Sequence, residues 1–81
     1  MGQNQLMEKQ VTVREINAHL QSDTAYCYVT RADGSNFRIA RARTRNGVME
    51  GRVINGSPKE WEMIPAGATS SLTRNELWIH A

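Results

Sequence analysis

Three arginines at alternate positions, just before an Asn-Gly pair, form the most chemically informative pattern in this sequence. Arg41, Arg43 and Arg45 precede Asn46-Gly47. Side chains two residues apart on a strand point the same way, so a strand here sets three guanidinium groups in one row. The planar guanidinium matches phosphate and carboxylate groups in shape and hydrogen bonding. We therefore expect this stretch to bind an anion.

The positive charge of the chain is concentrated in the same region. The 81 residues carry a net charge of +2, whereas residues 31–52 hold six arginines and two acidic residues and so carry +4. We predict binding of nucleic acid, RNA or DNA, with the phosphates contacted by a set of four side chains: Arg41, Arg43, Arg45 and Arg52. Tyr26 is expected across the first hairpin from Arg41, as a stacking platform for bases.

A second function remains open from the same residues. The basic face would also suit a protein-docking adaptor or inhibitor module that meets an acidic protein surface. Glu60 and Glu62 flank Trp61 and share a face if this segment is a strand. They are expected to be solvated, or to meet the arginine row of a neighbouring subunit.

The remaining reactive side chains do not predict catalysis. First and last strands are often neighbours in small barrels, which would bring Cys27 near His80 as a cysteine–histidine pair. A single strand cysteine is more often a small buried apolar group. The sequence has no Cys/His spacing typical of a metal site and no phosphate loop or dinucleotide fingerprint. We predict a binding protein without cofactor or metal rather than an enzyme.

Local signals in the sequence predict the helix and the strands on which these residues lie. Residues 1–11 are polar and predict a flexible N-terminal lead. Thr12 and Glu15 fit a capping box that begins a short amphipathic helix. The turn pairs Asp33-Gly34, Asn46-Gly47 and Asn55-Gly56 then delimit strands at about 25–32, 35–45, 48–54 and 59–64. A polar loop, a short helical turn at residues 73–76 and a last strand at about 77–80 complete the chain.

The turns also predict the strand register. A two-residue turn at Asn46-Gly47 sets Arg45 opposite Val48, Arg43 opposite Glu50, and Arg41 opposite Arg52. The Asp33-Gly34 turn would set Thr30 opposite Phe37 and Tyr28 opposite Ile39. The inward parity then changes near Ala40-Arg41, which predicts a bulge or bend that Gly51 on the partner strand would ease.

This order of elements resembles the layout of Sm-like and Src-homology-three-like small barrels, and residues 28–34 look like a first Sm-like hairpin. We expect a mainly β fold with residues 12–81 as one domain: a five-stranded, strongly bent antiparallel sheet or barrel with a short N-terminal α-helix. Both tryptophans are expected in the core. Besides Trp78, the predicted core residues are Val13, Ile16, Leu20, Tyr28, Phe37, Ile39, Val53, Trp61, Ile64, Leu77 and Ile79. Edge strands are expected to offer pairing to a second copy, giving a homo-oligomer.

The composition also indicates the cellular compartment. The single cysteine excludes an intrachain disulfide and favours a reducing compartment. No apolar run reaches membrane-spanning length, and the first ten residues lack the apolar core of a secretory signal. We expect a cytoplasmic protein with no membrane partner.

Overall fold

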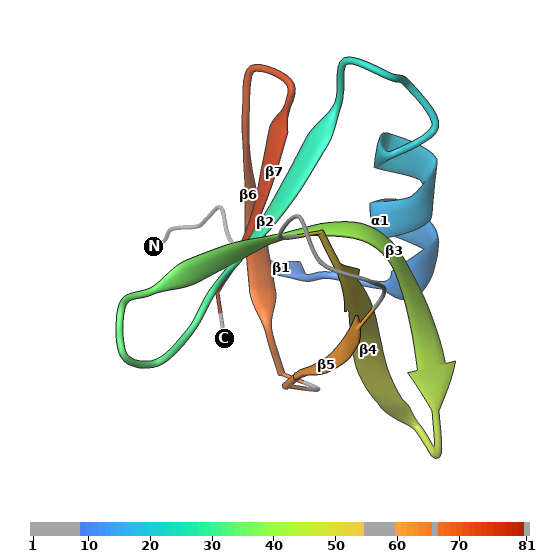
Figure 1. Cartoon of the computed structure of the whole chain (residues 1–81), viewed down its shortest axis with the longest axis vertical. Helices are drawn as coiled ribbons and strands as arrows, with labels where there is room; N and C mark the ends of the chain where they lie inside the picture. The colour runs from blue at the N-terminus through green and yellow to red at the C-terminus, as the bar shows by residue number, and fades with distance from the viewer. Residues whose placement is uncertain (1–8, 55–59, 66, 81) are drawn as a thin grey trace, which may run out of the picture.

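One mixed sheet holds most of the described residues, and one short helix packs against it (Figure 1). The computed structural model describes residues 9–54, 60–65 and 67–80. Its elements in chain order are β1 (Lys9–Gln10), α1 (Val13–His19), β2 (Tyr26–Thr30), β3 (Asn36–Arg45), β4 (Val48–Val53), β5 (Glu60–Ile64), β6 (Thr69–Thr73) and β7 (Glu76–His80).

The sheet is open rather than a closed barrel, and it has more strands than the sequence predicts. Its order is β1-β6-β7-β2-β3-β4-β5, so the described residues form six strands of five or more residues plus the two-residue β1. The prediction of a mainly β fold with a short N-terminal helix is confirmed, whereas the five strands, the purely antiparallel pairing and the closed barrel are wrong. The predicted polar loop contains β6, whose Thr-Ser-Ser-Leu-Thr sequence lacks the apolar alternation of a half-buried strand. β6 pairs with β7, and β7 pairs parallel to β2.

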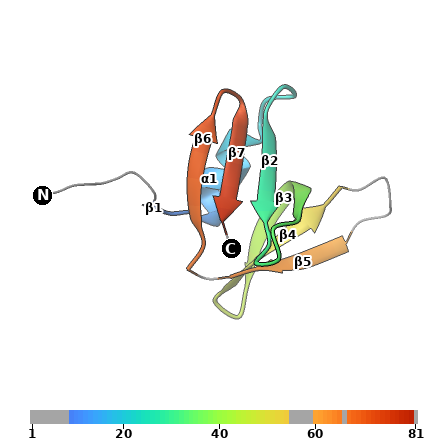
Figure 2. The same ribbon diagram turned by 90° about the vertical axis from the view of Figure 1, so that its left-hand side faces the viewer.

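Helix α1 forms as the capping signal predicts. Thr12 is the N-cap, and its side-chain oxygen accepts a hydrogen bond from the backbone N–H of Glu15 at 3.1 Å. Ile16 is fully buried, while Val13 and Leu20 are partly buried against the core. Figure 2 shows α1 behind the β6–β7 pair, on one face of the sheet, where the helix packs against β2 and β3. The opposite face is the outward face.

The β3–β4 hairpin has the predicted register. Asn46 and Gly47 both have positive φ, as a two-residue type I′ turn requires. The pairing shifts between Ile39 and Arg41, where the sequence predicts a bulge. A Cβ on Gly51 would lie 3.0 Å from side-chain atoms of Ile39 and Ile64, so a glycine is needed where these chains pack closely.

The first hairpin differs from the prediction by one residue. Arg31 N donates to Ser35 O at 2.7 Å, which closes a three-residue loop with Gly34 at φ 88°. Thr30 therefore pairs with Asn36, and Tyr28 pairs with Arg38 rather than Ile39. This single shift sends Tyr28 to the outward face and Cys27 and Val29 into the core.

The core otherwise contains most of the predicted residues. The buried apolar cluster comprises Val11, Ile16, Cys27, Val29, Phe37, Ile39, Ala42, Met49, Val53, Ile64, Ala68, Leu77 and Ile79. Trp61 was expected there, but its edge-strand position leaves it 37% exposed. Tyr28 and Trp78 are only partly buried, because they share the outward face.

Three further predictions concern the ends of the elements. Most of the predicted N-terminal lead lies outside the described residues. Of its last residues, Gln10 in β1 pairs with Thr69 in β6, and Val11 is buried. The expected helical turn at residues 73–76 is instead the tight turn of the β6–β7 hairpin. The predicted Asn55-Gly56 turn lies outside the described residues.

Candidate nucleic-acid interface

The arginine row lies on one exposed face of β3. Arg41, Arg43 and Arg45 are exposed, whereas Ala42 between them is buried. Arg41 lies opposite Arg52 on β4. Two like charges facing each other across a strand pair are destabilising unless an anion lies between them. This part of the hairpin therefore favours a bound anion.

Arg43 differs from the other arginines of the row. Its Nε lies 2.9 Å from a carboxylate oxygen of Glu50, and its guanidinium lies 3.8 Å from the centre of the Trp61 ring. Glu50 is only 9% exposed, so this ion pair offsets the cost of removing its carboxylate from water. Arg41, Arg45 and Arg52 form no ion pair within the described residues. They are the groups of this hairpin whose charge remains available to a ligand.

A cluster of aromatic rings lies on the outward face of the central strands, and we call it the ring face: Tyr26 and Tyr28 on β2, and Trp78 on β7. The Tyr28 and Trp78 rings are stacked with centres 4.6 Å apart, and those of Tyr26 and Tyr28 lie 6.4 Å apart. All three side chains are partly buried rather than core residues. The guanidinium of Arg38 lies 4.4 Å from the centre of the Tyr26 ring.

Tyr26 is therefore on the surface as predicted, but its arginine partner is Arg38 and not Arg41. Sequence reasoning missed the contribution of Tyr28 and Trp78. The signal was present, because both aromatic residues alternate with aliphatic or thiol side chains that point inward. In β2 these are Cys27 and Val29, and in β7 they are Leu77 and Ile79. β3 carries both Arg38 beside the ring face and Arg41 at the start of the arginine row.

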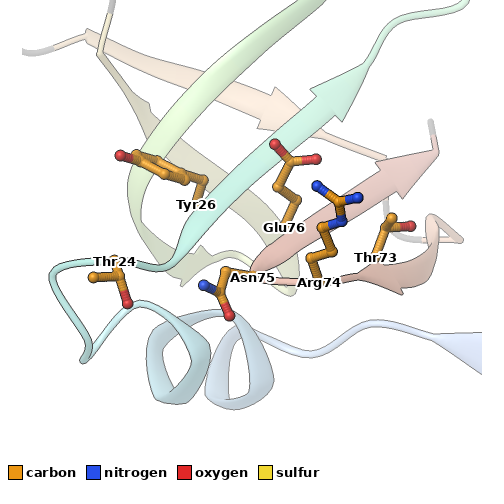
Figure 3. A pocket seen from close by; sticks show the side chains of 6 residues that line it. All are labelled: Thr24, Tyr26, Thr73, Arg74, Asn75 and Glu76. Atoms are coloured by element: carbon orange, nitrogen blue, oxygen red, sulfur yellow. The ribbon is translucent and has the colours of Figure 1, made fainter.

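A hollow of about 440 Å³ adjoins the ring face at the β6–β7 turn. It is lined by Thr24, Tyr26, Thr73, Arg74, Asn75 and Glu76. Figure 3 shows Tyr26 and Glu76 projecting from the same side of neighbouring strands, with Arg74 at the turn. The indole Nε1 of Trp78 donates to Oε1 of Glu76 at 3.3 Å. Arg74 has a positive φ of 55°, a conformation that few non-glycine residues adopt.

Helix α1 fixes the backbone beneath this hollow. Nε2 of His19 lies 2.8 Å from the carbonyl oxygen of Tyr26 and 3.0 Å from that of Asn75. Two carbonyl acceptors require that this nitrogen carry a proton and donate. The backbone N–H of Tyr26 donates to the same Asn75 carbonyl at 2.9 Å. The turn is thus tied both to the helix and to β2.

The structure separates the residues of the considered cysteine–histidine pair. Cys27 is fully buried, and burial raises the pKa of its thiol to about 12. His80 pairs with Thr30 and lies 3.0 Å from the Ser71 hydroxyl oxygen. Strand alternation puts Cys27 and His80 on opposite faces of the sheet, so they cannot act together.

Glu62 has a partner within its own chain. Its carboxylate accepts two hydrogen bonds from Arg31, at 2.8 Å from Nε and 2.9 Å from Nη2. Glu60 is exposed on the same strand. Trp61 and Met63, which alternate with these acids, are 37% and 56% exposed. The outer part of β5 therefore presents apolar as well as charged surface.

Among residues 9–54, 60–65 and 67–80, no group of three or more His, Cys, Asp or Glu side chains is placed to hold a metal ion. Within the same ranges, no helix has the length and apolar character needed to cross a membrane. No protein-family model matches the chain, and searches of curated proteins and solved structures found no significant match.

Proposed function

We propose that this protein binds nucleic acid through the outward surface of its sheet. Arg41, Arg45 and Arg52 would contact phosphates, and Tyr26 on the ring face would stack on a base. The observation that carries the proposal is that arginines without an ion pair among the described residues lie on the same sheet as partly exposed aromatic rings. Guanidinium groups for the backbone and rings for the bases are the combination that single-stranded nucleic acids require.

The contacts with phosphate make affinity depend on salt. Each neutralised phosphate releases counterions, so the logarithm of the affinity falls by about 0.7 per phosphate and per logarithmic unit of salt for a single strand. Three arginines on three phosphates therefore predict a slope of about −2. Fluorescence anisotropy with labelled single- and double-stranded oligonucleotides across a salt series measures this slope.

The Arg45→Ala substitution tests the assignment of the arginine row. Arg45 is exposed and makes no ion pair among the described residues, so its loss should leave the fold intact. We expect weaker binding and a slope that is smaller by about 0.7. Arg14→Ala removes the same charge from an exposed position on α1 and is the matched control. Arg43 is unsuitable for this test, because its removal would leave Glu50 without an ion-pair partner among the described residues.

Equal effects of Arg45→Ala and Arg14→Ala would show that only net charge matters and would contradict a site on the hairpin. No binding of any oligonucleotide at low salt would remove the proposed function. The free thiol of Cys27 is compatible with a reducing compartment, so we extend the proposal to a cytoplasmic location.

The exposed surface of β5 favours a second candidate, a docking module for an acidic protein. Trp61 is partly exposed beside the arginines and is of the residue type most enriched at interface hot spots. A titration with poly-L-glutamate, which has the charge of an acidic surface but no bases, separates the candidates. Binding of poly-L-glutamate in preference to oligonucleotides of equal charge would support the docking module.

A further inference from the structure

The hollow beside Tyr26 combines an aromatic wall with a carboxylate. Tyr26, Glu76 and Thr73 form one row across β2, β7 and β6, because Glu76 pairs with both of the others. Arg38 packs on the Tyr26 ring at 4.4 Å and so fixes the position of that wall. A planar group entering the hollow would lie against an aromatic ring and beside a carboxylate (Figure 3).

The carboxylate of Glu76 is held in place but retains acceptor capacity. The indole N–H of Trp78 donates to Oε1 at 3.3 Å. Among the described side chains, Glu76 makes no other hydrogen bond and no ion pair. An ionised carboxylate accepts about four hydrogen bonds and donates none. Both oxygens can therefore accept from a ligand that presents two adjacent N–H groups.

Of the common bases, guanine presents that pattern. Its Watson–Crick edge carries the N1–H and N2–H groups side by side, which match the two oxygens of a carboxylate. Adenine and cytosine present one donor beside a ring-nitrogen acceptor, and uracil and thymine present one N–H between two carbonyl oxygens. A carboxylate repels each of those acceptors. Unpaired bases are commonly read in this way, with stacking on an aromatic side chain and hydrogen bonds to the Watson–Crick edge.

We propose that the hollow is a binding site for an unpaired guanine base of a single-stranded nucleic acid. The base stacks against Tyr26 and donates two hydrogen bonds to Glu76, whose orientation is set by Trp78. Arg74, at the turn and without an ion pair in the described part of the chain, contacts the adjoining phosphate. This inference rests on the proposed function and adds to it a preference for one base and for unpaired strands.

The test uses two labelled probes, a short oligothymidine and the same oligonucleotide with one central guanine. We expect the wild-type protein to bind the guanine probe about tenfold more tightly, the discrimination typical of a good bidentate contact. Glu76→Gln should abolish this preference, because its amide NH2 group faces a second donor on guanine. Glu60→Gln makes the same charge change at an exposed position of β5 and should preserve the preference.

Two further measurements keep the test independent of folding and charge. Circular dichroism of each variant establishes that the fold is retained. Tyr26→Leu should lower affinity for the guanine probe about tenfold, because stacking on one base is lost. Equal binding of both probes by the wild type, or an unchanged preference in Glu76→Gln, would overturn the guanine site and leave the proposed function intact. If neither probe binds, the guanine site is overturned, and if no single- or double-stranded oligonucleotide binds at low salt, the proposed function is overturned as well.

Discussion

Arg43 and Arg45 lie two residues apart on the same face of β3, yet they have different roles. Arg43 is held between the nearly buried Glu50 and the ring of Trp61, so its charge serves the fold. Arg45 points into solvent at the end of the strand. Residue type alone does not distinguish the two. The acidic residue on the opposite strand does, because it decides which guanidinium is neutralised.

Cys27 carries a prediction about stability at alkaline pH. Its ordinary pKa of 9.0 rises to about 12 in the folded protein, because burial disfavours the thiolate. Between these values the unfolded chain has lost the thiol proton and the folded protein keeps it. Stability therefore falls as the pH rises above 9, by at most about 1.4 kcal/mol per pH unit.

Urea unfolding of the wild type and of Cys27→Ala at pH 8 and pH 10 measures this contribution. We expect the wild type to lose about 1 kcal/mol more than the variant between the two pH values. The variant is the control for other groups that titrate in the same range. Equal losses in both proteins would show that Cys27 is not protected from deprotonation by burial.

At the scale of elements, α1 covers a stretch of β3 that, in the described part of the chain, has no neighbouring strand on one side. β2 pairs with β3 only as far as Ile39, and β3 continues to Arg45. The side chain of Asn17 lies at this open edge. Its Nδ2 donates to the carbonyl oxygen of Ala42 at 2.9 Å, and its Oδ1 accepts from the Ala42 N–H at 3.0 Å. One amide side chain thus replaces the peptide group that a further strand would supply.

We predict that Asn17→Ala destabilises the fold by about 1–3 kcal/mol, because it leaves the Ala42 N–H and carbonyl groups without partners. Alanine is the better helix former, so a loss would occur despite higher helix propensity. Denaturant unfolding measures the change, and Arg14→Ala on the exposed side of α1 is the control. Unchanged or increased stability of Asn17→Ala would contradict the role of Asn17 at the β3 edge.

At the scale of the whole molecule, the sheet bends but does not close. The bidentate pair of Arg31 and Glu62 links the end of β2 to β5. β5 nevertheless remains the last strand in the sheet order of the described residues. A terminal strand presents unpaired backbone groups on its outer side, and charged side chains are a common means of protecting it. Here the strand also exposes Trp61 and Met63.

We therefore predict association of two copies through β5. Sedimentation velocity should show a mass that rises with protein concentration. Met63→Lys should shift the equilibrium toward the monomer, because a lysine at the edge opposes pairing. Ala18→Lys, at an exposed position of α1, introduces the same charge away from the edge. A monomer mass at every concentration would contradict the association.

Features that depend on residues close together in the chain could be predicted from the sequence. The cap of α1, the turn at Asn46-Gly47, the register that follows from it and the bulge near Arg41 were predicted correctly. Each arises from local backbone preferences or from the period of two residues along a strand. The exposed arginine row is a direct consequence, because the turn fixes the face on which the three side chains lie.

The pairing of distant strands, and the face that each strand presents, depend on contacts between parts of the chain far apart in the sequence. The parallel pairing of β2 with β7 brings together Tyr28 and Trp78, which are 50 residues apart in the sequence. β6 forms a strand because it pairs with the edge of β7. Its Thr-Ser-Ser sequence does not by itself predict a strand. A one-residue difference in the first loop, which local preference does not fix, moved Tyr28 from the predicted core to the surface. The ring face therefore comes from long-range pairing, whereas the arginine row comes from a local turn.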